Sequence, residues 1–250
     1  MFAVSFEGDI ARYDGTVWTT SLTQGGFFSA IHGTSASDAW AVTQDAKIWH
    51  FNGSSWTSTA APRANGLWAV YAQASNNVFA VGDSGAVFRY NGTSWSVVPG
   101  VPTTTQNLYG VWAASATDVY VVGENGAAYR WNGTTWSTLP TGLASDTLYS
   151  ISGSAATNIL AVGTRGTVMK WNGVSWTRLT QSITSSSLYS VHALSATEAY
   201  TIGADGLLVK YDGTSFTNPS SVAVACGIVY SFGSTIGTFV GGQIGVTAVT

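Results

Sequence analysis

The chain has 250 residues and a formal net charge of −3 at pH 7; 45% of its residues are hydrophobic and only 8% are charged. About a quarter of the residues in a typical soluble protein are charged, so Ser, Thr, Asn and Gly must form most of the polar surface. The lack of a Lys/Arg cluster argues against nucleic acid as a partner, and no apolar run reaches the roughly eighteen residues of a membrane span.

The first residues already belong to a repeat. Phe2-Ala3-Val4 recurs as Trp40-Ala41-Val42 and as Phe79-Ala80-Val81, so the chain begins in mid-repeat. It lacks the basic n-region and the cleavage-like end of a signal peptide, and none is predicted in this chain. An uncharged polar surface suits an extracellular protein, so we predict an extracellular or cell-surface location. The single cysteine, Cys226, excludes an internal disulfide framework.

A six-residue pattern occurs six times: an aromatic residue, Asp or Asn, Gly, two small residues and a second aromatic residue. Successive copies are 38 to 41 residues apart. A period near forty that contains a hairpin turn is typical of repeat architectures with one supersecondary unit per copy. The first aromatic residues are Tyr13, Phe51, Tyr90, Trp131, Trp171 and Tyr211, and the second are Trp18, Trp56, Trp95, Trp136, Trp176 and Phe216.

Residues 108–140 show one repeat in full. Alternating apolar residues predict four strands, separated by polar or Gly-containing turns. Asn132-Gly133 predicts a hairpin turn between the third and fourth strands, since both residues tolerate the positive φ that favoured two-residue turns need, and Pro140 ends the fourth. The predicted strands are Leu108–Trp112, Val119–Gly123, Ala127–Trp131 and Trp136–Leu139.

The predicted fold class is all-β: a β-propeller of four-stranded antiparallel blades. The third strands carry apolar residues on both faces, so each sheet must be covered on both sides by its neighbours. These residues are Val87, Ala128, Val168 and Leu208 on one face and Phe88, Tyr129, Met169 and Val209 on the other.

We expect residues 1–250 to form a single propeller domain closed by both termini. Six blades are favoured, and seven are the alternative because joining the ends leaves two strand-equivalents over. The complete blades are predicted at about 27–59, 67–98, 108–140, 148–180 and 188–219, and the closing blade at 2–22 plus 226–250.

The pattern Ser/Thr-Ala-Ser/Thr-Asp, then Val-Gly-x-x-Gly, then aromatic-Asn/Asp-Gly-x-x-Trp resembles the repeats of bacterial propeller proteins that are often secreted or surface-anchored. Gly33–Val42 is an especially close match. Asn91–Trp95 is more distantly similar to the Asp-box hairpin of sialidase-type propellers, although the Asp box separates its Asp and Gly by one residue. The resemblance covers nearly the whole chain and implies a fold rather than an activity, because propellers include lectins, hydrolases, lyases and scaffolds.

A basic residue precedes the first aromatic residue in every copy, which predicts a ring of basic residues at the ends of the third strands. Such a ring could bind an acidic polymer. We favour a structural interpretation, in which each side chain lies over the blade surface or on a neighbouring aromatic ring, with Asp45, Asp83, Glu124 and Asp205 as local partners. The ring consists of Arg12, His50, Arg89, Arg130, Lys170 and Lys210.

Aromatic residues and histidines supply the candidate ligand-binding residues. The indoles of Trp95, Trp136 and Trp176 suit pyranose C–H groups, and their repetition would make a lectin multivalent; the alternative is that they fill gaps between outer strands. A unique site is expected where the repeats differ most, at the end of the first predicted strand, although a difference in packing would also explain this variation. That position holds His32, Tyr71, Trp112, Ser152 and His192, of which all but Ser152 are candidates.

A short polar residue precedes the second strand in five repeats, where its side chain can accept backbone N–H groups of the turn. No loop carries the run of oxygen ligands of a calcium site, so neither a metal nor a cofactor is predicted. These residues are Asp38, Asn77, Asp118, Asn158 and Glu198.

No nucleophile–base motif or convergent set of arginines is apparent, so no enzyme is predicted. The predicted function is a non-catalytic ligand-binding propeller that is carbohydrate-binding and extracellular, with a glycan or a surface protein as its partner. The alternative is a structural or protein–protein interaction propeller within a surface assembly, in which the uncharged C-terminal strands pair with another chain. A glycoside hydrolase or lyase is least favoured.

Overall fold

The computed structural model describes residues 1–23, 26–180, 183–217, 229–232 and 235–238. Its described elements are β-strands and three-residue 3₁₀ turns, so the predicted all-β class is confirmed. By internal contacts the chain divides into two compact units, one of Met1–Val119 with Trp131–Ser137 and one of Tyr120–Arg130 with Thr138–Thr250.

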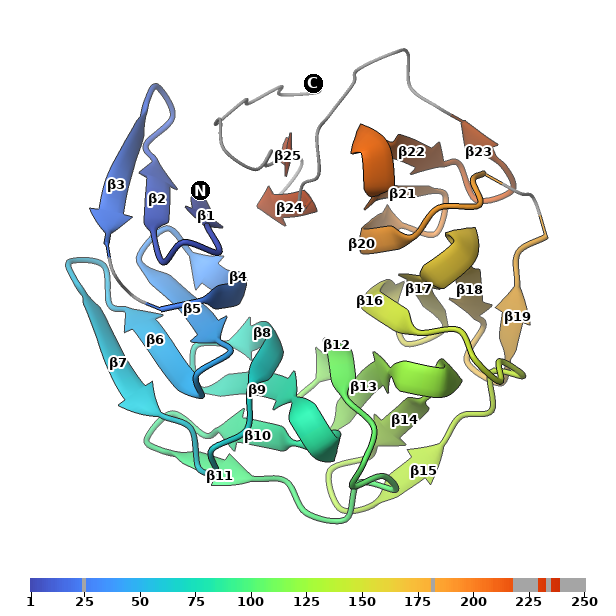
Figure 1. Ribbon diagram of the computed structural model, residues 1–250, viewed down its shortest axis with the longest axis horizontal. Helices are drawn as coiled ribbons and strands as arrows, with labels where there is room; N and C mark the ends of the chain where they lie inside the picture. Colours follow the sequence, from blue (N-terminus) through green and yellow to red (C-terminus); the bar gives the residue numbers. More distant parts are fainter. Residues whose placement is uncertain (24–25, 181–182, 218–228, 233–234, 239–250) are drawn as a thin grey trace. The chain divides into compact units, whose positions relative to one another are not determined.

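The first unit contains three antiparallel sheets whose strands follow one another in chain order (Figure 1). The first strands β4, β8 and β12 lie side by side, and β1 lies beside β4. The bounds are β1 (Phe2–Val4), β2 (Ile10–Tyr13), β3 (Trp18–Leu22); β4 (Phe28–Ser35), β5 (Asp38–Thr43), β6 (Lys47–Phe51), β7 (Trp56–Ala60); β8 (Leu67–Ala74), β9 (Asn77–Gly82), β10 (Val87–Tyr90), β11 (Trp95–Val97); and β12 (Leu108–Ser115), with turn η1 at Asp83–Gly85.

The second unit contains two four-stranded sheets of the same kind and a strand pair near the C-terminus. The boundary between the units runs through β13, β14 and β15. The bounds are β13 (Asp118–Gly123), β14 (Ala128–Trp131), β15 (Trp136–Thr138); β16 (Leu148–Ala155), β17 (Asn158–Gly163), β18 (Val168–Trp171), β19 (Trp176–Arg178); β20 (Leu188–Ser195), β21 (Glu198–Gly203), β22 (Leu208–Tyr211), β23 (Phe216–Thr217); and β24 (Val229–Phe232), β25 (Thr235–Thr238), with turns η2 (Glu124–Gly126), η3 (Thr164–Gly166) and η4 (Ala204–Gly206).

Among the described residues, the strands form five four-stranded sheets, one three-stranded sheet and one two-stranded sheet. This number of sheets fits six blades. The closing blade would join residues 2–22 to 226–250, and most of the latter segment lies outside the described residues. Closure of the ring, and the single domain with its blade boundaries, therefore stay predictions.

The four strands predicted for residues 108–140 are present, but the first is longer than expected. It runs to Ser115 and leaves only Ala116 and Thr117 for the turn into β13. The first strands of the neighbouring repeats have the same eight-residue length, and each has two shifts of register. Such shifts mark β-bulges, which bend and twist a strand and interrupt the simple alternation from which its end was predicted.

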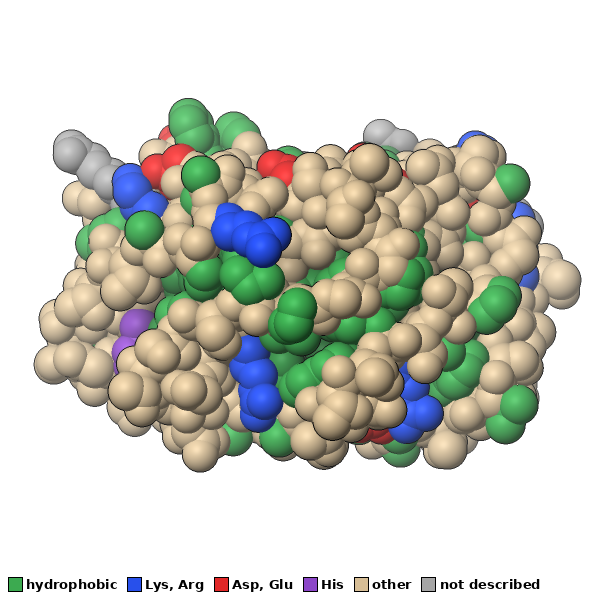
Figure 2. Space-filling model, turned by 90° about the horizontal axis from the view of Figure 1, so that it is seen from below, with side chains coloured by type: hydrophobic (Ala, Val, Ile, Leu, Met, Phe, Trp, Pro, Cys, Tyr) green, Lys and Arg blue, Asp and Glu red, His purple; other side chains and the backbone are tan. Residues whose placement is uncertain are grey.

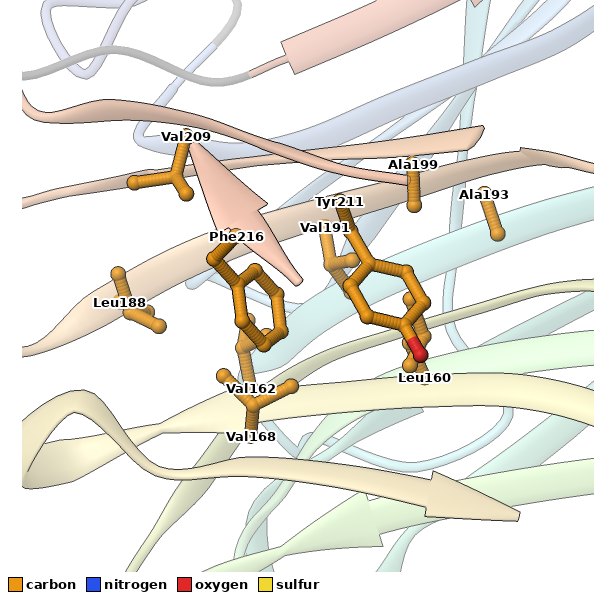
Figure 3. Packing of buried hydrophobic residues seen from close by; sticks show 10 residues of the cluster. All are labelled: Leu160, Val162, Val168, Leu188, Val191, Ala193, Ala199, Val209, Tyr211 and Phe216. Atoms are coloured by element: carbon orange, nitrogen blue, oxygen red, sulfur yellow. The ribbon is translucent and has the colours of Figure 1, made fainter. Parts of the chain in front are cut away.

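The third strands are buried on both faces, as their apolar residues predict. Phe88 and Val209 are 0% exposed, and Val87 and Val168, on the opposite face, are 1% and 2% exposed. In the second unit, side chains from β17 and β18 pack against side chains from β20 to β23 (Figure 3). This cluster consists of Leu160, Val162, Val168, Leu188, Val191, Ala193, Ala199, Val209, Tyr211 and Phe216.

The Asn-Gly hairpins are present between the paired aromatic residues, but only the glycine has the positive φ that was expected of both turn residues. Tyr90 pairs with Trp95, so four residues form the loop, and Gly92, with φ 96°, has positive φ whereas Asn91 does not. The Asn91 carboxamide oxygen instead accepts the backbone N–H groups of Thr93 and Ser94. The same pair of bonds, 2.7–3.0 Å long, occurs at all six hairpins, at Asp14, Asn52, Asn91, Asn132, Asn172 and Asp212.

The turn with two consecutive positive φ angles lies between the second and third strands. In η1, Ser84 has φ 54° and Gly85 has φ 70°, and Ala86 N–H donates to the Asp83 carbonyl at 3.0 Å. A Cβ at Gly85 would collide with the carbonyl oxygen of Thr103 in the next loop. Glycine is required here both for its backbone conformation and for the close approach of another backbone.

The surface is largely uncharged, and few Lys, Arg, Asp and Glu side chains appear on the face shown in Figure 2. No helix in the described residues has the length and apolar character needed to cross a membrane.

We expect Gly85→Ala to destabilise the protein more than Gly142→Ala. Both residues have positive φ, 70° and 73°, but a Cβ at Gly142 would meet no atom within 4 Å. The shared strain costs about 1 kcal/mol, and the collision with Thr103 adds about 2 kcal/mol more. Urea unfolding of the two variants and the wild type measures the difference; equal losses would contradict the role of the close approach.

Candidate functional site

The basic residues of the third strands lie on aromatic rings. The Arg12 guanidinium carbon is 5.7 Å from the centre of the Phe2 ring, in its own sheet, and 5.3 Å from that of Phe51, in the next sheet. Each ring is within the range in which a cation is attracted to the π-face. Arg12 therefore joins two neighbouring sheets.

Arg89 makes the same pair of contacts two sheets later. Its guanidinium carbon is 5.6 Å from the centre of the Phe79 ring and 5.4 Å from that of Trp131. Its Nε donates a 2.8 Å hydrogen bond to the Asn77 side-chain oxygen. The guanidinium is thus held by two rings and one polar partner, as the structural interpretation of the basic ring predicts.

The second unit repeats this arrangement with Lys. Lys170 Nζ is 5.3 Å from the centre of the Tyr211 ring in the next sheet and donates to its hydroxyl at 3.2 Å. Lys210 lies 5.4 Å from the Tyr200 ring and forms a 3.0 Å ion pair with Glu198. The hydrogen bond from Lys210 holds the pKa of Glu198 below its usual value. In the same unit the Arg130 guanidinium carbon lies 5.5 Å from the Tyr120 ring.

The polar partners of the basic ring are not those expected. Asp45 pairs with Lys47 at 2.7 Å, and Asp83 accepts the Trp68 indole N–H at 2.7 Å, so for these two acids the prediction was wrong. The first residues of the second strands, such as Asn77, Glu198 and Asp38, take this role instead. In these three sheets the residue paired directly with the basic position is aromatic, and the polar residue lies two positions before it, on the same face of the sheet.

The same residues were predicted to accept backbone N–H groups of their turn, but the bonds of Asn77 and Asn158 have other partners. Asn77 Nδ2 donates to Gln73 Oε1 at 3.2 Å, and Asn158 Nδ2 donates to Ser154 Oγ at 2.7 Å. The turn N–H groups are accepted by serine hydroxyls, as at Ser35. Serine lies two residues before the donor, which is the spacing that a short hydroxyl side chain can span.

His50 differs from the other members of the basic ring. Its imidazole stacks on Trp40 with ring centres 3.9 Å apart and an interplanar angle of 15°. Its Nε2 is 2.8 Å from Asp38 Oδ1, and the other Asp38 oxygen accepts the Thr34 hydroxyl. An ionised Asp38 requires the proton on Nε2, which leaves Nδ1 as an acceptor in the neutral ring.

A cavity of about 390 Å³ opens beside His50, between the sheets β4–β7 and β8–β11. Its size is in the range of small-ligand sites. Trp40, one of its lining residues, packs against both Tyr90 and Trp95, with ring centres 4.7 Å and 5.5 Å apart. The hydroxyls come from β7 and from the hairpin that precedes β11. The lining includes Trp40, His50, Thr57, Tyr90, Ser94 and Trp95.

The structure does not bring Trp95, Trp136 and Trp176 together, and only Trp95 lines this cavity. Trp176 is 8% exposed and packs on Trp171 of its own hairpin, with ring centres 5.5 Å apart. Trp136 is half-buried beside Gly100. Their role as sugar platforms stays a prediction.

The variable position of the first strands lies in the middle of each strand, not at its end as predicted. In the first unit, the His32 and Tyr71 rings are 4.5 Å apart, and Tyr71 and Trp112 are 6.5 Å apart. His32 Nδ1 accepts the Ala72 N–H at 3.1 Å. Burial raises the pKa of Tyr71, against a smaller opposing effect of its hydrogen bond with the Trp112 side chain. These residues thus link adjacent first strands, and a ligand site there stays a prediction.

The second unit uses a serine for the same link. Ser152 Oγ accepts the Ala193 N–H at 3.0 Å, as His32 accepts that of Ala72. The adjacent His192 is partly buried, and burial lowers its pKa from the ordinary value of 6.5.

One set of partly exposed aromatic residues was not singled out from the sequence. They follow the first residue of β8, β12, β16 and β20, and a register shift surrounds the position in three of these strands. Trp68 and Tyr109 are 5.4 Å apart, and Tyr149 and Tyr189 are 5.7 Å apart. The repeated Leu-aromatic pair at the strand start was the available signal. We call Trp68, Tyr109, Tyr149 and Tyr189 the strand-start aromatics.

No family model and no curated protein matches the sequence. A solved structure described as YCF48 bound to D1 peptide is 14% identical with a TM-score of 0.71, covering 95% of this chain and 84% of that one. The WD40 β-propeller domain of Doa1 is 12% identical with a TM-score of 0.80, covering 95% and 84%.

Virginiamycin B lyase from Staphylococcus aureus is 9% identical with a TM-score of 0.75, covering 95% of this chain and 89% of that one. Similarity of this kind shows the fold: the chain is a β-propeller. The resemblance to bacterial surface repeat proteins and to Asp-box propellers stays a prediction.

We expect Arg89→Met to lower the free energy of unfolding by about 1–3 kcal/mol, because it removes two cation–π contacts and the bond to Asn77. Arg63→Met is the matched control, since Arg63 is exposed, and should change stability by less than about 0.5 kcal/mol. Chemical denaturation of both variants checks the difference. Equal stabilities would show that the basic ring is not structural at Arg89.

We expect His192 to reduce stability at acid pH. Its folded pKa lies below the ordinary 6.5, so the unfolded chain binds more protons, and stability falls as the pH falls below about 6.5, by at most about 1.4 kcal/mol per unit. His192→Gln should flatten the pH dependence of unfolding between pH 7.5 and pH 5. A parallel dependence in both proteins, or an NMR titration of His192 at or above 6.5, would contradict this.

Proposed function

We propose that this propeller is a non-catalytic binding module for a peptide segment or a protein surface. The observation that carries the proposal is the set of strand-start aromatics, which are partly exposed and in contact with one another within each unit. Tyr189 is 42% exposed. The exposed rings of Phe6 and Phe27, 5.1 Å apart, lie at the same ends of their sheets.

Partly exposed aromatic rings on rigid strands favour protein recognition. Tyr and Trp supply large contact areas and a polar atom, and they are enriched at interfaces. Because few charged side chains lie near these rings, docking of a partner would remove little hydration water from charged groups. Trp68 is further fixed by its bond to Asp83, so little side-chain entropy is left to lose.

The similar structures support this proposal at the level of the fold. One is a propeller bound to a peptide, and another is a WD40 propeller domain. A third similar structure is a lyase. In the described part of this chain, Asp38 binds the His50 imidazole and the Thr34 hydroxyl, and no nucleophilic side chain is hydrogen-bonded to the imidazole.

Carbohydrate binding is the second candidate, and the cavity beside Trp95 favours it. Its aromatic rings and hydroxyl groups match the apolar faces and hydroxyls of a pyranose. An extracellular or cell-surface location is proposed with it, on the low charge of the chain. Self-association through the C-terminal strands is a further proposal; β24 and β25 pair with each other.

Binding to parallel peptide and glycan arrays tests the two candidates. We expect peptide ligands whose affinity falls at least about tenfold in Tyr189→Ser or Trp68→Ser, the loss of one interface anchor. Val174→Ser is the control, because Val174 is 85% exposed at a hairpin tip away from the strand starts. Glycan ligands without peptide ligands, or full peptide affinity in both aromatic variants, would contradict the proposal.

A further inference from the structure

We propose that the cavity beside His50 takes the cationic side chain, arginine or lysine, of a bound peptide. The inference rests on the proposed function only for the source of the cation. In other repeats, the equivalent position between two sheets holds a basic side chain of the chain itself.

In three other repeats, a cation of the third strand covers the first aromatic ring of the next sheet. Arg12 lies 5.3 Å from the Phe51 ring, and Arg89 lies 5.4 Å from the Trp131 ring. Lys170 lies 5.3 Å from the Tyr211 ring. The groove between two blades is therefore a site that accepts guanidinium and ammonium groups.

The second sheet lacks this cation. His50 is shorter than Arg or Lys, and its ring lies flat on Trp40, 3.9 Å away. Tyr90, the first aromatic residue of the next sheet, is flanked by Trp40 and by Trp95, with ring centres 4.7 Å and 5.6 Å away. The cavity of about 390 Å³ lies where the other repeats hold their own basic side chain.

The lining suits a cation better than a neutral group. Tyr90 and Trp95 are partly exposed and line the cavity with aromatic rings, whose faces attract positive charge. Trp40, 3% exposed, is covered by the His50 ring. His50 Nε2 is 2.8 Å from Asp38 Oδ1, so a carboxyl group is hydrogen-bonded to the imidazole that lines the cavity. The hydroxyl oxygens of Thr57 and Ser94 are acceptors for guanidinium N–H groups.

A titration with N-acetyl-arginine amide, followed by Trp fluorescence and by the indole N–H signals in NMR spectra, tests the proposal on the wild-type chain. The neutral isostere N-acetyl-citrulline amide and a panel of methyl glycosides are the comparison ligands. We expect saturable binding of the arginine probe, at least tenfold tighter than that of the citrulline probe or any glycoside. Citrulline binding of equal strength, or tighter glycoside binding, would overturn the proposal.

His50→Arg is the variant that fills the cavity with the chain's own cation, as Arg89 does one sheet later. It should weaken the arginine probe at least tenfold. Arg89→Lys is the matched control and should leave probe binding unchanged, because it keeps a cation in a groove that is already filled. Unchanged probe binding in folded His50→Arg would overturn the proposal.

The result is separable from the test of the proposed function. If the peptide array yields ligands that depend on Tyr189 or Trp68 and the arginine probe does not bind, only the cavity inference fails. If the probe binds and no peptide does, the cavity is a cation site, and the peptide source of the cation is wrong.

Discussion

The structure depends on the need to cover a sheet that is apolar on both faces. Val87 and Phe88 point to opposite sides of one strand, and both are buried. A single sheet cannot bury both of its faces, so each sheet must pack between two others, and the repeated sequence supplies those neighbours. The bulges of the first strands and the glycine turns serve this packing, because they set how closely successive sheets can approach.

Charged groups stabilise the same arrangement toward the outer strands. A basic side chain such as Arg89 is shared between two sheets, held by rings on each side and by a polar residue of its own sheet. Its burial between rings explains how a chain with so few charges can place most of its Lys and Arg at one repeated position. His50 is the exception, and there a cavity opens.

The sequence predicted the fold well because its signals are local. Period, alternation and Asn-Gly turns identified the strands of residues 108–140 to within a few positions. The signals failed where tertiary contacts decide the outcome. Asn91 caps its hairpin with its side chain, and the bulges lengthen the first strands beyond the end of their alternation. Trp95 and His50 were both singled out, but their joint position beside Trp40 depends on the packing of two sheets. The strand-start aromatics were overlooked because a repeated Leu-aromatic pair reads simply as the beginning of a strand.

The glycine turns bind the next loop through backbone hydrogen bonds. Gly85 N–H donates to the Gln106 carbonyl and Gly126 N–H to the Asp146 carbonyl, at 2.8 Å and 2.7 Å. Side chains of the loop that enters each first strand also take part, because Asn107 accepts the Ser84 N–H and the Thr141 hydroxyl donates to the Gly126 carbonyl. These loops therefore belong to the packed framework. A new binding loop grafted at residues 99–107 or 140–147 would have to keep Thr103, Asn107, Thr141 and Asp146 and vary the exposed residues between them.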